Sequence, residues 1–283
     1  MSVSLLLTKL NIPHTRASGV IRPRLTEKLF DGVNRPGSFV LLSGPAGFGK
    51  TTLLSEFVGQ LGQPVAWVSL DEGDNDPIRF WTYLITACQS FQPKVGESAL
   101  AFFQTSQPLP DDAIPTILIN DLVRLESDLI LILDDYHLIH NPFIHAALGF
   151  LLDHIPDRLH LVLSTRVDPP WPLARFRARG QLLEIRAVDL RFTTEEAAAF
   201  LHQVMELNLS TEDVAALEAH TEGWVASLQL AAISMRGRSD VAGFIQAFTG
   251  SHVYVADYLI EEVLEHQTEE TKPSCCRHPF SNT

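Results

Sequence analysis

The sequence predicts an α/β fold, a doubly wound parallel sheet, followed by an all-helical region. The first observation is that short, continuously apolar runs alternate with longer helical patterns as far as Leu190. Such runs are typical of parallel strands that are covered on both faces. The second is that strand–helix alternation requires right-handed crossovers, which place helices on both faces of one sheet. The third is that helical patterns beyond Leu190 follow one another without a strand-like run.

Five apolar runs of the first region are the predicted strands. They are Phe39–Ser43, Val65–Leu70, Leu129–Leu133, Leu159–Ser164 and Leu182–Ile185. The helical patterns between them are Lys50–Gln60, Ile78–Gln89, Ala113–Leu125 and Phe143–His154. This order of elements assigns residues 1–193 to one α/β domain.

The helical region opens with a capping signal. Thr193 is the expected N-cap and Glu196 stands at the third helical position, which together make a capping box. The predicted helices are Glu195–Met205, Thr211–His220, Val225–Met235, Val241–Phe248 and Val253–Leu264. We therefore expect a helical unit over residues 194–271.

The last stretch, residues 272–283, differs in character. It contains two prolines, the adjacent Cys275 and Cys276, and no helical periodicity. Two explanations remain open: a shifted reading frame, or an ordinary disordered terminus.

Composition and charge exclude several classes of protein. Of the 283 residues, 46% are hydrophobic and 19% are charged, which excludes a disordered or low-complexity chain. The net charge of −13 argues against non-specific binding to nucleic acid or anionic lipid. No apolar run reaches the roughly 18 residues of a membrane-spanning helix, and the N-terminus lacks a signal-peptide pattern. Cys88 lies in an apolar helical pattern and is expected in the core. We expect a cytoplasmic protein without a membrane partner.

The strongest motif is GPAGFGKT at residues 44–51, which matches G-x-x-x-x-G-K-[ST] between a predicted strand and a predicted helix. Its glycines let successive N–H groups point at a phosphate, and the helix N-terminus favours an anion. Lys50 would reach the β- and γ-phosphates, and the Thr51 hydroxyl would coordinate Mg²⁺. The expected nucleotide contacts are Gly44, Pro45, Ala46, Gly47, Phe48, Gly49, Lys50, Thr51 and Thr52. The structural alternative is a plain strand–turn–helix connection.

Two further strands end in polar residues. LILILDD at residues 129–135 is typical of a Walker B strand, so Asp134 would hold Mg²⁺ directly or through water. Asp135 could polarise the attacking water as a catalytic base. LVLSTR at residues 161–166 places Arg166 at the same sheet edge, where it could sense the γ-phosphate. A turn after the strand and a solvated arginine are the corresponding structural alternatives.

An acidic loop follows the second predicted strand. Its carboxylates, DEGDND at residues 71–76, do not have the spacing of a calcium-binding loop. Asp76 followed by Pro77 instead predicts a helix N-cap and the first helical residue.

Taken together, these motifs resemble the ATPase module of the large ATP-dependent LuxR-type transcription activators, the MalT-like group. The resemblance runs over almost the whole chain, from about residue 6 to about residue 270. The segments that carry it are RPRL at 22–25, GPAGFGKTT at 44–52, WVSLDEGDN at 67–75, LILDDYHLI at 131–139, LSTR at 163–166, QLLEIR at 181–186, GWVASLQL at 223–230 and DYLIEEVL at 257–264.

The resemblance implies a signal-transduction NTPase of the STAND class. ADP would hold its resting state, ATP and an inducer would drive self-association, and hydrolysis would reset the switch. Arg22 and Arg24 would lie near the adenine, and Arg166 would be the sensor arginine. In this group a winged-helix unit, a helical sensor and a C-terminal helix-turn-helix follow the ATPase core. The chain carries only the start of a winged-helix region, so DNA binding would belong to a C-terminal domain that it lacks.

Three functions therefore stay open. The first is a regulatory switch that binds ATP or ADP with Mg²⁺ and hydrolyses at about 10⁻³–10⁻² s⁻¹. The second is a dedicated catalytic ATPase or kinase, although no motif for positioning a phosphoacceptor is present. The third is a truncated, non-functional fragment whose apolar faces are exposed.

Overall fold

The computed structural model describes residues 5–14, 19–103, 112–236 and 240–248. Its internal contacts divide the chain into two compact units. The first consists of residues 1–45 and 49–190, and the second of residues 46–48 and 191–283. The first unit thus ends at Leu190, whereas the sequence analysis places the domain boundary after residue 193.

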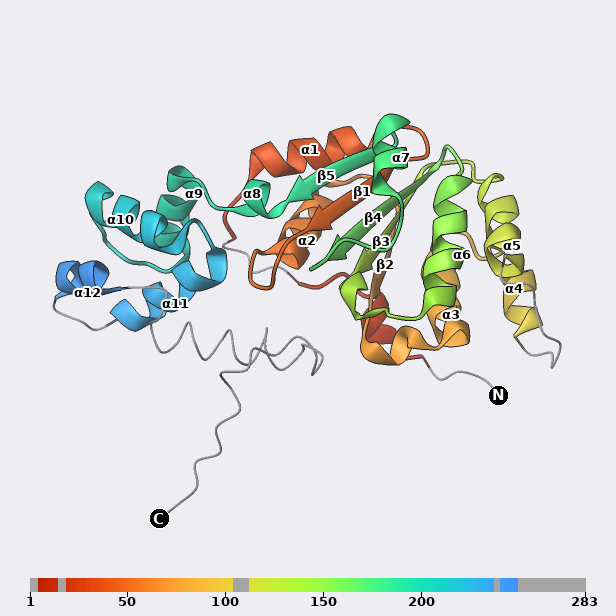
Figure 1. The fold of residues 1–283 in the computed structure, drawn as a ribbon, viewed down its shortest axis with the longest axis horizontal. Coiled ribbons are helices and arrows are strands. Elements are labelled where there is room, and N and C mark those ends of the chain that lie inside the picture. The colour runs from red at the N-terminus through yellow and green to blue at the C-terminus, as the bar shows by residue number, and fades with distance from the viewer. Residues whose placement is uncertain (1–4, 15–18, 104–111, 237–239, 249–283) are drawn as a thin grey trace, which may run out of the picture. The chain divides into compact units, whose positions relative to one another are not determined.

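The first unit is built on a five-stranded parallel sheet, which confirms the predicted fold class (Figure 1). The strands are β1 (Phe39–Ser43), β2 (Val65–Ser69), β3 (Leu129–Asp134), β4 (Leu159–Thr165) and β5 (Leu182–Arg186). Their order across the sheet is β2-β3-β4-β1-β5. Each end differs from its predicted position by no more than one residue. The largest consequence is that Asp134 is the last residue of β3 rather than the first residue after it.

Helices connect these strands. They are α1 (Pro23–Val33), α2 (Lys50–Gln60), α3 (Pro77–Gln89), α4 (Glu97–Phe102), α5 (Ala113–Leu122), α6 (Pro142–Asp153), α7 (Leu173–Ala178) and α8 (Ala187–Leu190). The described residues of this unit also form three short 3-10 turns: η1 (Leu7–Leu10), η2 (Glu72–Asn75) and η3 (Tyr136–Leu138). The predicted helix over Ala113–Leu125 ends early, because the Leu125 N–H closes a tight turn on the Leu122 carbonyl.

Both faces of the sheet are covered. Alternate strand residues such as Phe39 and Leu41 join one buried cluster with apolar side chains of α3, α5 and α6. The intervening residue Val40 faces α1, where a Cβ on Gly32 would lie only 2.7 Å from its side chain. Gly32 is therefore the residue that lets the helix approach the strand closely. The result is a three-layer arrangement, with β4 at the centre of the sheet and β1 between β4 and the edge strand β5.

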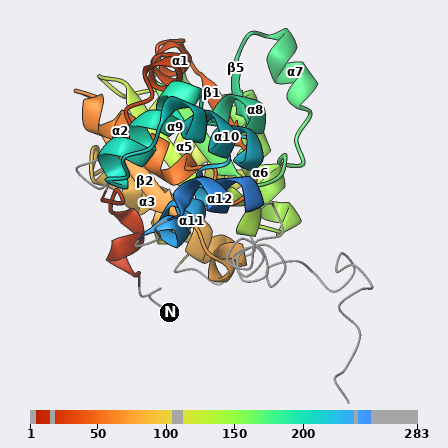
Figure 2. The same cartoon turned by 90° about the vertical axis from the view of Figure 1, so that its left-hand side faces the viewer.

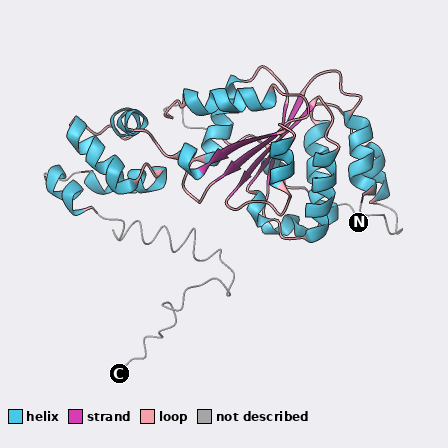
Figure 3. Cartoon of the chain, turned by 45° about the horizontal axis from the view of Figure 1, so that its top comes forward, coloured by secondary structure: helices cyan, strands magenta, loops and turns pink. Residues whose placement is uncertain are grey.

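The second unit is helical throughout its described residues (Figures 2 and 3). Its elements are α9 (Thr194–Ala199), a π-helical turn η4 (Phe200–Val204), α10 (Thr211–Thr221), α11 (Val225–Met235) and α12 (Val241–Ala247). The Thr193–Glu196 capping box forms as predicted. The predicted helix over Glu195–Met205 changes to π geometry halfway, where the Met205 N–H bonds to the Phe200 carbonyl at 3.0 Å.

Two predicted segments, Val253–Leu264 and the stretch 272–283, lie outside the described residues. Cys88 is fully buried, as predicted, and burial raises the pKa of its thiol to about 12. Within the described ranges, no helix combines the length and apolarity needed to cross a bilayer.

Candidate functional site

The loop over residues 44–51 connects the end of β1 to the start of α2. Gly44 is tied to the neighbouring strand by a 3.2 Å bond from its N–H to the Thr165 carbonyl. Gly47 and Gly49 have left-handed backbones, with φ of 75° and 73°. A side chain is disfavoured in this conformation, so the two glycines permit the curl of the loop. The curl leads into α2 at Lys50, which puts the N–H groups of the first helical turn beside the loop.

Lys50 is buried at the base of this loop, with 7% of its surface exposed. Its ammonium group donates to the carbonyls of Gly44 and Pro45, at 2.6 and 2.9 Å. Burial lowers the pKa of Lys50 to about 8; the carboxylates of Asp135 and Asp134 oppose the shift and the Arg166 guanidinium adds to it. The structure therefore brings four of the predicted site residues within electrostatic reach of one another.

Thr51 and Asp134 form a direct pair. The Thr51 hydroxyl donates to Asp134 Oδ2 at 2.8 Å, and Asp134 is almost fully buried. The other oxygen of this carboxylate accepts the N–H of Asp135 at 3.1 Å. A hydroxyl and a carboxylate side by side are the hard oxygen ligands that suit Mg²⁺, so these residues fit such an ion. Thr52, the next residue on α2, is exposed.

Asp135 and Arg166 occupy the ends of adjacent strands. Asp135 follows β3 with a left-handed backbone, φ 59°, a conformation that aspartate tolerates better than most residues. Its carboxylate lies 3.9 Å from the His137 ring. Arg166 follows β4 and is partly buried. Because β3 and β4 are parallel neighbours, both side chains belong to the same sheet edge.

Arg22 and Arg24 contact the short helix α8. Arg22 donates to the Leu190 carbonyl at 2.7 Å, and Arg24 donates to the Asp189 carbonyl at 2.6 Å. Burial raises the pKa of the Glu56 carboxyl on α2, and the Arg22 guanidinium opposes this shift. Arg22 therefore lies near the helix that begins with Lys50, whereas the described bond of Arg24 is to α8.

Within the second unit, the loop residues 46–48 contact the start of α11. The Trp224 indole N–H donates to the Ala46 carbonyl at 3.0 Å, and its ring stacks on Phe48. The Ala226 N–H, in the first turn of α11, donates to the Gly47 carbonyl at 3.1 Å. Trp224 enters the sequence analysis only within the GWVASLQL segment, so its hydrogen bond to the loop is a contact that sequence reasoning missed. The preceding glycine, Gly223, marks a close approach to a different segment, because a Cβ there would lie 2.6 Å from the Phe192 carbonyl oxygen.

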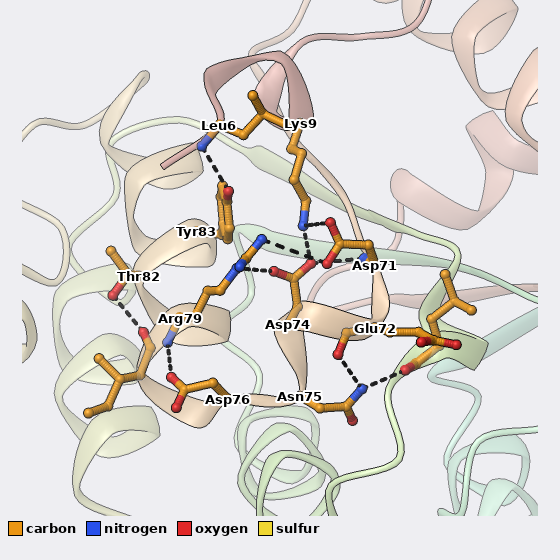
Figure 4. A network of polar contacts seen from close by, with 12 residues as sticks. Leu6, Lys9, Asp71, Glu72, Asp74, Asn75, Asp76, Arg79, Thr82 and Tyr83 are labelled. Carbon is orange, nitrogen blue, oxygen red and sulfur yellow. Dashed lines mark hydrogen bonds and ion pairs between the residues drawn. The ribbon is translucent and has the colours of Figure 1, made fainter. Parts of the chain in front are cut away.

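The acidic loop after β2 has a structural role that was predicted in part. Asp76 is the N-cap of α3, with Pro77 at the first helical position, as predicted. The role of Lys9 was not predicted: its ammonium pairs with Asp71 at 3.0 Å and with the buried Asp74 (Figure 4). No local pattern could have identified Lys9, because 65 positions separate it from Asp74.

Comparison with known proteins identifies relatives of this arrangement. Residues 22–164 match a family model described as an AAA ATPase domain. Over 270 residues the chain is 36% identical to the HTH-type transcriptional regulator MalT of Klebsiella pneumoniae, a match that covers 95% of this chain and 30% of that protein. Over 252 residues it is 34% identical to the serine/threonine-protein kinase PknK of Mycobacterium tuberculosis, covering 87% of this chain and 22% of the kinase. The chain thus spans less than a third of the length of these curated relatives.

A solved structure has a similar fold. A Walker-type ATPase of Pyrococcus abyssi superposes with a TM-score of 0.55 at 16% identity, over 92% of this chain and 79% of that one. At this level of identity the likeness concerns the fold alone.

Proposed function

The chain belongs to the AAA ATPase domain family and is a MalT-like P-loop ATPase module, and from this premise we propose that it is a regulatory switch that binds ATP and ADP. The observation that carries the proposal is the Thr51–Asp134 hydrogen bond of 2.8 Å beside the buried Lys50. It joins the phosphate loop to the acidic strand end, which are the two parts that a phosphoryl-transfer site requires.

The phosphate loop supplies the binding groups for the nucleotide. Backbone N–H groups of residues 46–51 would cradle the phosphates, and the N-terminus of α2 favours their negative charge. On ligand binding the Lys50 ammonium exchanges the carbonyls of Gly44 and Pro45 for β- and γ-phosphate oxygens. Arg22 and Arg24 are proposed to lie on the adenine side.

The metal site consists of the Thr51 hydroxyl and the Asp134 carboxylate. A bound Mg²⁺ would neutralise charge on the phosphates. Asp134 is held for this role by the N–H of Asp135, which fixes one of its oxygens. The second oxygen accepts the Thr51 hydroxyl, so the two candidate ligand atoms lie 2.8 Å apart.

Hydrolysis is assigned to the residues at the strand ends. Asp135, whose side chain is 42% exposed, orients the attacking water and accepts its proton. Arg166 lies near Lys50 and stabilises charge on the γ-phosphate. We propose slow turnover, so that the bound nucleotide serves as a signal.

A switch explains the relatives better than a dedicated catalyst does. The same stretch is shared by a transcriptional regulator and by a protein kinase, in which it covers 30% and 22% of the length. A module that is shared by proteins with different activities is best suited to regulate the other domains of each protein. Self-association in the ATP state, and DNA binding through a C-terminal domain, are proposed for a longer parent protein.

Thermal unfolding tests the proposal. The purified chain is melted alone, with Mg²⁺-ATP and with Mg²⁺-ADP, and its turnover is measured in parallel. A ligand at roughly 100 times its dissociation constant adds about 2.7 kcal/mol of apparent stability, so both nucleotides are expected to raise the melting temperature. A cooperative melt that neither nucleotide shifts would overturn nucleotide binding. Turnover of about 1–100 s⁻¹, the range of kinases, would favour a dedicated catalyst.

A further inference from the structure

The side-chain amide of Asn75 lies between two loops that are distant in sequence. Its Nδ2 group donates to the Glu72 carbonyl at 2.9 Å and to the Leu138 carbonyl at 2.8 Å. Its Oδ1 atom accepts the N–H groups of His140 and Asn141, at 2.6 and 3.0 Å. All four hydrogen-bonding positions of the amide are therefore occupied by backbone groups.

These partners fix the orientation of the amide. Two carbonyls can face only the NH₂ group, and two N–H groups can face only the oxygen. A flipped amide would lose all four bonds, so the orientation follows from the backbone around it. An aspartate of the same size would keep the two accepted bonds, but it would turn an oxygen toward two carbonyl oxygens.

The loop that Asn75 holds is the one that begins with Asp135. The Leu138 carbonyl accepts from Asn75, while the Leu138 N–H donates to the Asp135 carbonyl at 3.1 Å. Leu138 thus links the amide to the backbone of Asp135 through two hydrogen bonds. The left-handed backbone of Asp135 costs free energy and persists only where the surrounding structure fixes it.

The loop that carries Asn75 is itself firmly held (Figure 4). Asp74, the residue before it, is fully buried and accepts from Lys9, from Arg79 Nε at 3.1 Å and from the Asp71 N–H at 2.9 Å. The Lys9 ammonium also lies over the Tyr83 ring, 4.5 Å from its centroid. Because the ion pairs of the buried Asp74 hold the loop that carries Asn75, the Asn75 amide is itself fixed and can position the neighbouring loop.

We propose that Asn75 is a positioning residue for hydrolysis, which sets the place of Asp135 by holding the Leu138 carbonyl. This inference rests on the proposed function, in which Asp135 acts on the attacking water. Asn75 has no described contact with Lys50, Thr51 or Asp134, so its influence is on the hydrolysis step and not on nucleotide binding.

Turnover and nucleotide affinity of variants test the inference. Asn75→Ala and Asn75→Asp are expected to lower kcat by about tenfold or more, since small displacements of a reacting group are costly. The dissociation constant for Mg²⁺-ATP should stay within about twofold of the unchanged chain. Asn75→Asp keeps the size of the side chain and provides the result if Asn75→Ala does not fold.

A double-mutant cycle separates positioning from general destabilisation. Once Asp135→Asn has removed the base, adding Asn75→Ala should produce no further fall in kcat. The matched control is Asp76→Ala in the same loop, which loses the N-cap bond to the Arg79 N–H but none of the bonds to the Asp135 loop. It should lower the melting temperature and leave kcat unchanged.

The outcomes distinguish the two proposals. If the unchanged chain hydrolyses ATP and Asn75→Ala does so at the same rate, the positioning role is overturned while the switch stands. The positioning role would also be overturned if Asn75→Ala lowered kcat by the same factor in the unchanged chain and in the Asp135→Asn variant. If the unchanged chain shows no hydrolysis, the proposed mechanism fails, and the positioning role fails with it.

Discussion

Thr51 on the first turn of α2 and Asp134 at the end of β3 share a hydrogen bond of 2.8 Å, although 83 positions separate them in the sequence. The bond connects the helix that follows β1 to the end of β3, and these two strands are not neighbours, because β4 lies between them. The bond therefore depends on β4, which holds β1 and β3 in place.

Replacement of Lys50 by alanine should abolish most nucleotide binding. The ammonium is buried and would pair with phosphate, and the loss of one partner of a buried charge pair costs about 2–5 kcal/mol. We expect the affinity for Mg²⁺-ATP, measured by calorimetry, to fall by about a hundredfold or more, while the circular dichroism spectrum stays the same. Arg124→Ala removes an equal charge from an exposed site and is the control. An unchanged affinity would refute the assignment of the phosphate loop.

Replacement of Asp134 by asparagine should weaken the Mg²⁺ dependence of ATP binding. An amide retains the shape of the side chain but removes the negative charge that a divalent ion prefers. The midpoint of a Mg²⁺ titration is expected to rise by about tenfold. Asp31→Asn, on the exposed side of α1, makes the same chemical change away from the site. Identical titration curves for the Asp134 variant and the unchanged chain would count against a metal role.

The affinity for nucleotide should decrease as the pH rises above 8. Burial lowers the pKa of Lys50 to about 8, so the ammonium loses its proton near that pH in the free protein. A bound phosphate favours the charged form and raises the pKa, so binding takes up a proton above pH 8. Calorimetry in buffers of different ionisation enthalpy measures this uptake. The Lys50→Arg variant keeps its positive charge over this pH range. If its affinity has the same pH profile as that of the unchanged chain, Lys50 is excluded as the titrating group.

Replacement of Trp224 by phenylalanine should destabilise the second unit. The change removes the N–H that donates to the Ala46 carbonyl and keeps a ring that can stack on Phe48. A lost hydrogen bond of this kind costs about 1 kcal/mol in denaturant unfolding. Phe48→Leu removes the stacking and keeps the indole donor, so the two variants separate the contributions. Equal stability of Trp224→Phe and the unchanged chain would mean that the bond contributes nothing.

The parts of the fold that were predictable depend on local patterns. Strands such as β3 are recognisable because a run of aliphatic residues is needed when both faces are covered. The Thr193 cap follows from its spacing of three positions to Glu196, and the Asp76 cap follows from the proline directly after it. The phosphate loop was identified because its glycines, lysine and threonine have fixed spacing.

The parts that were not predictable depend on contacts between distant segments. Asn75 bonds to Leu138 across 63 positions, and neither residue belongs to a motif that names the other. The strand order likewise leaves no periodic trace in the sequence. The turn to π geometry at Phe200 has no local signal either, because the helical pattern continues through it.

The order of the strands has a consequence for the synthesis of the protein. β1 pairs with β4 and β5, which are the last two of the described strands in sequence order. A ribosome adds about 5–20 residues each second. The apolar FVLLS segment of β1 is therefore synthesised several seconds before the strands that pair with it. Nascent chains that stall before β5 should therefore depend on a chaperone. The binding loop acquires its shape only late in translation.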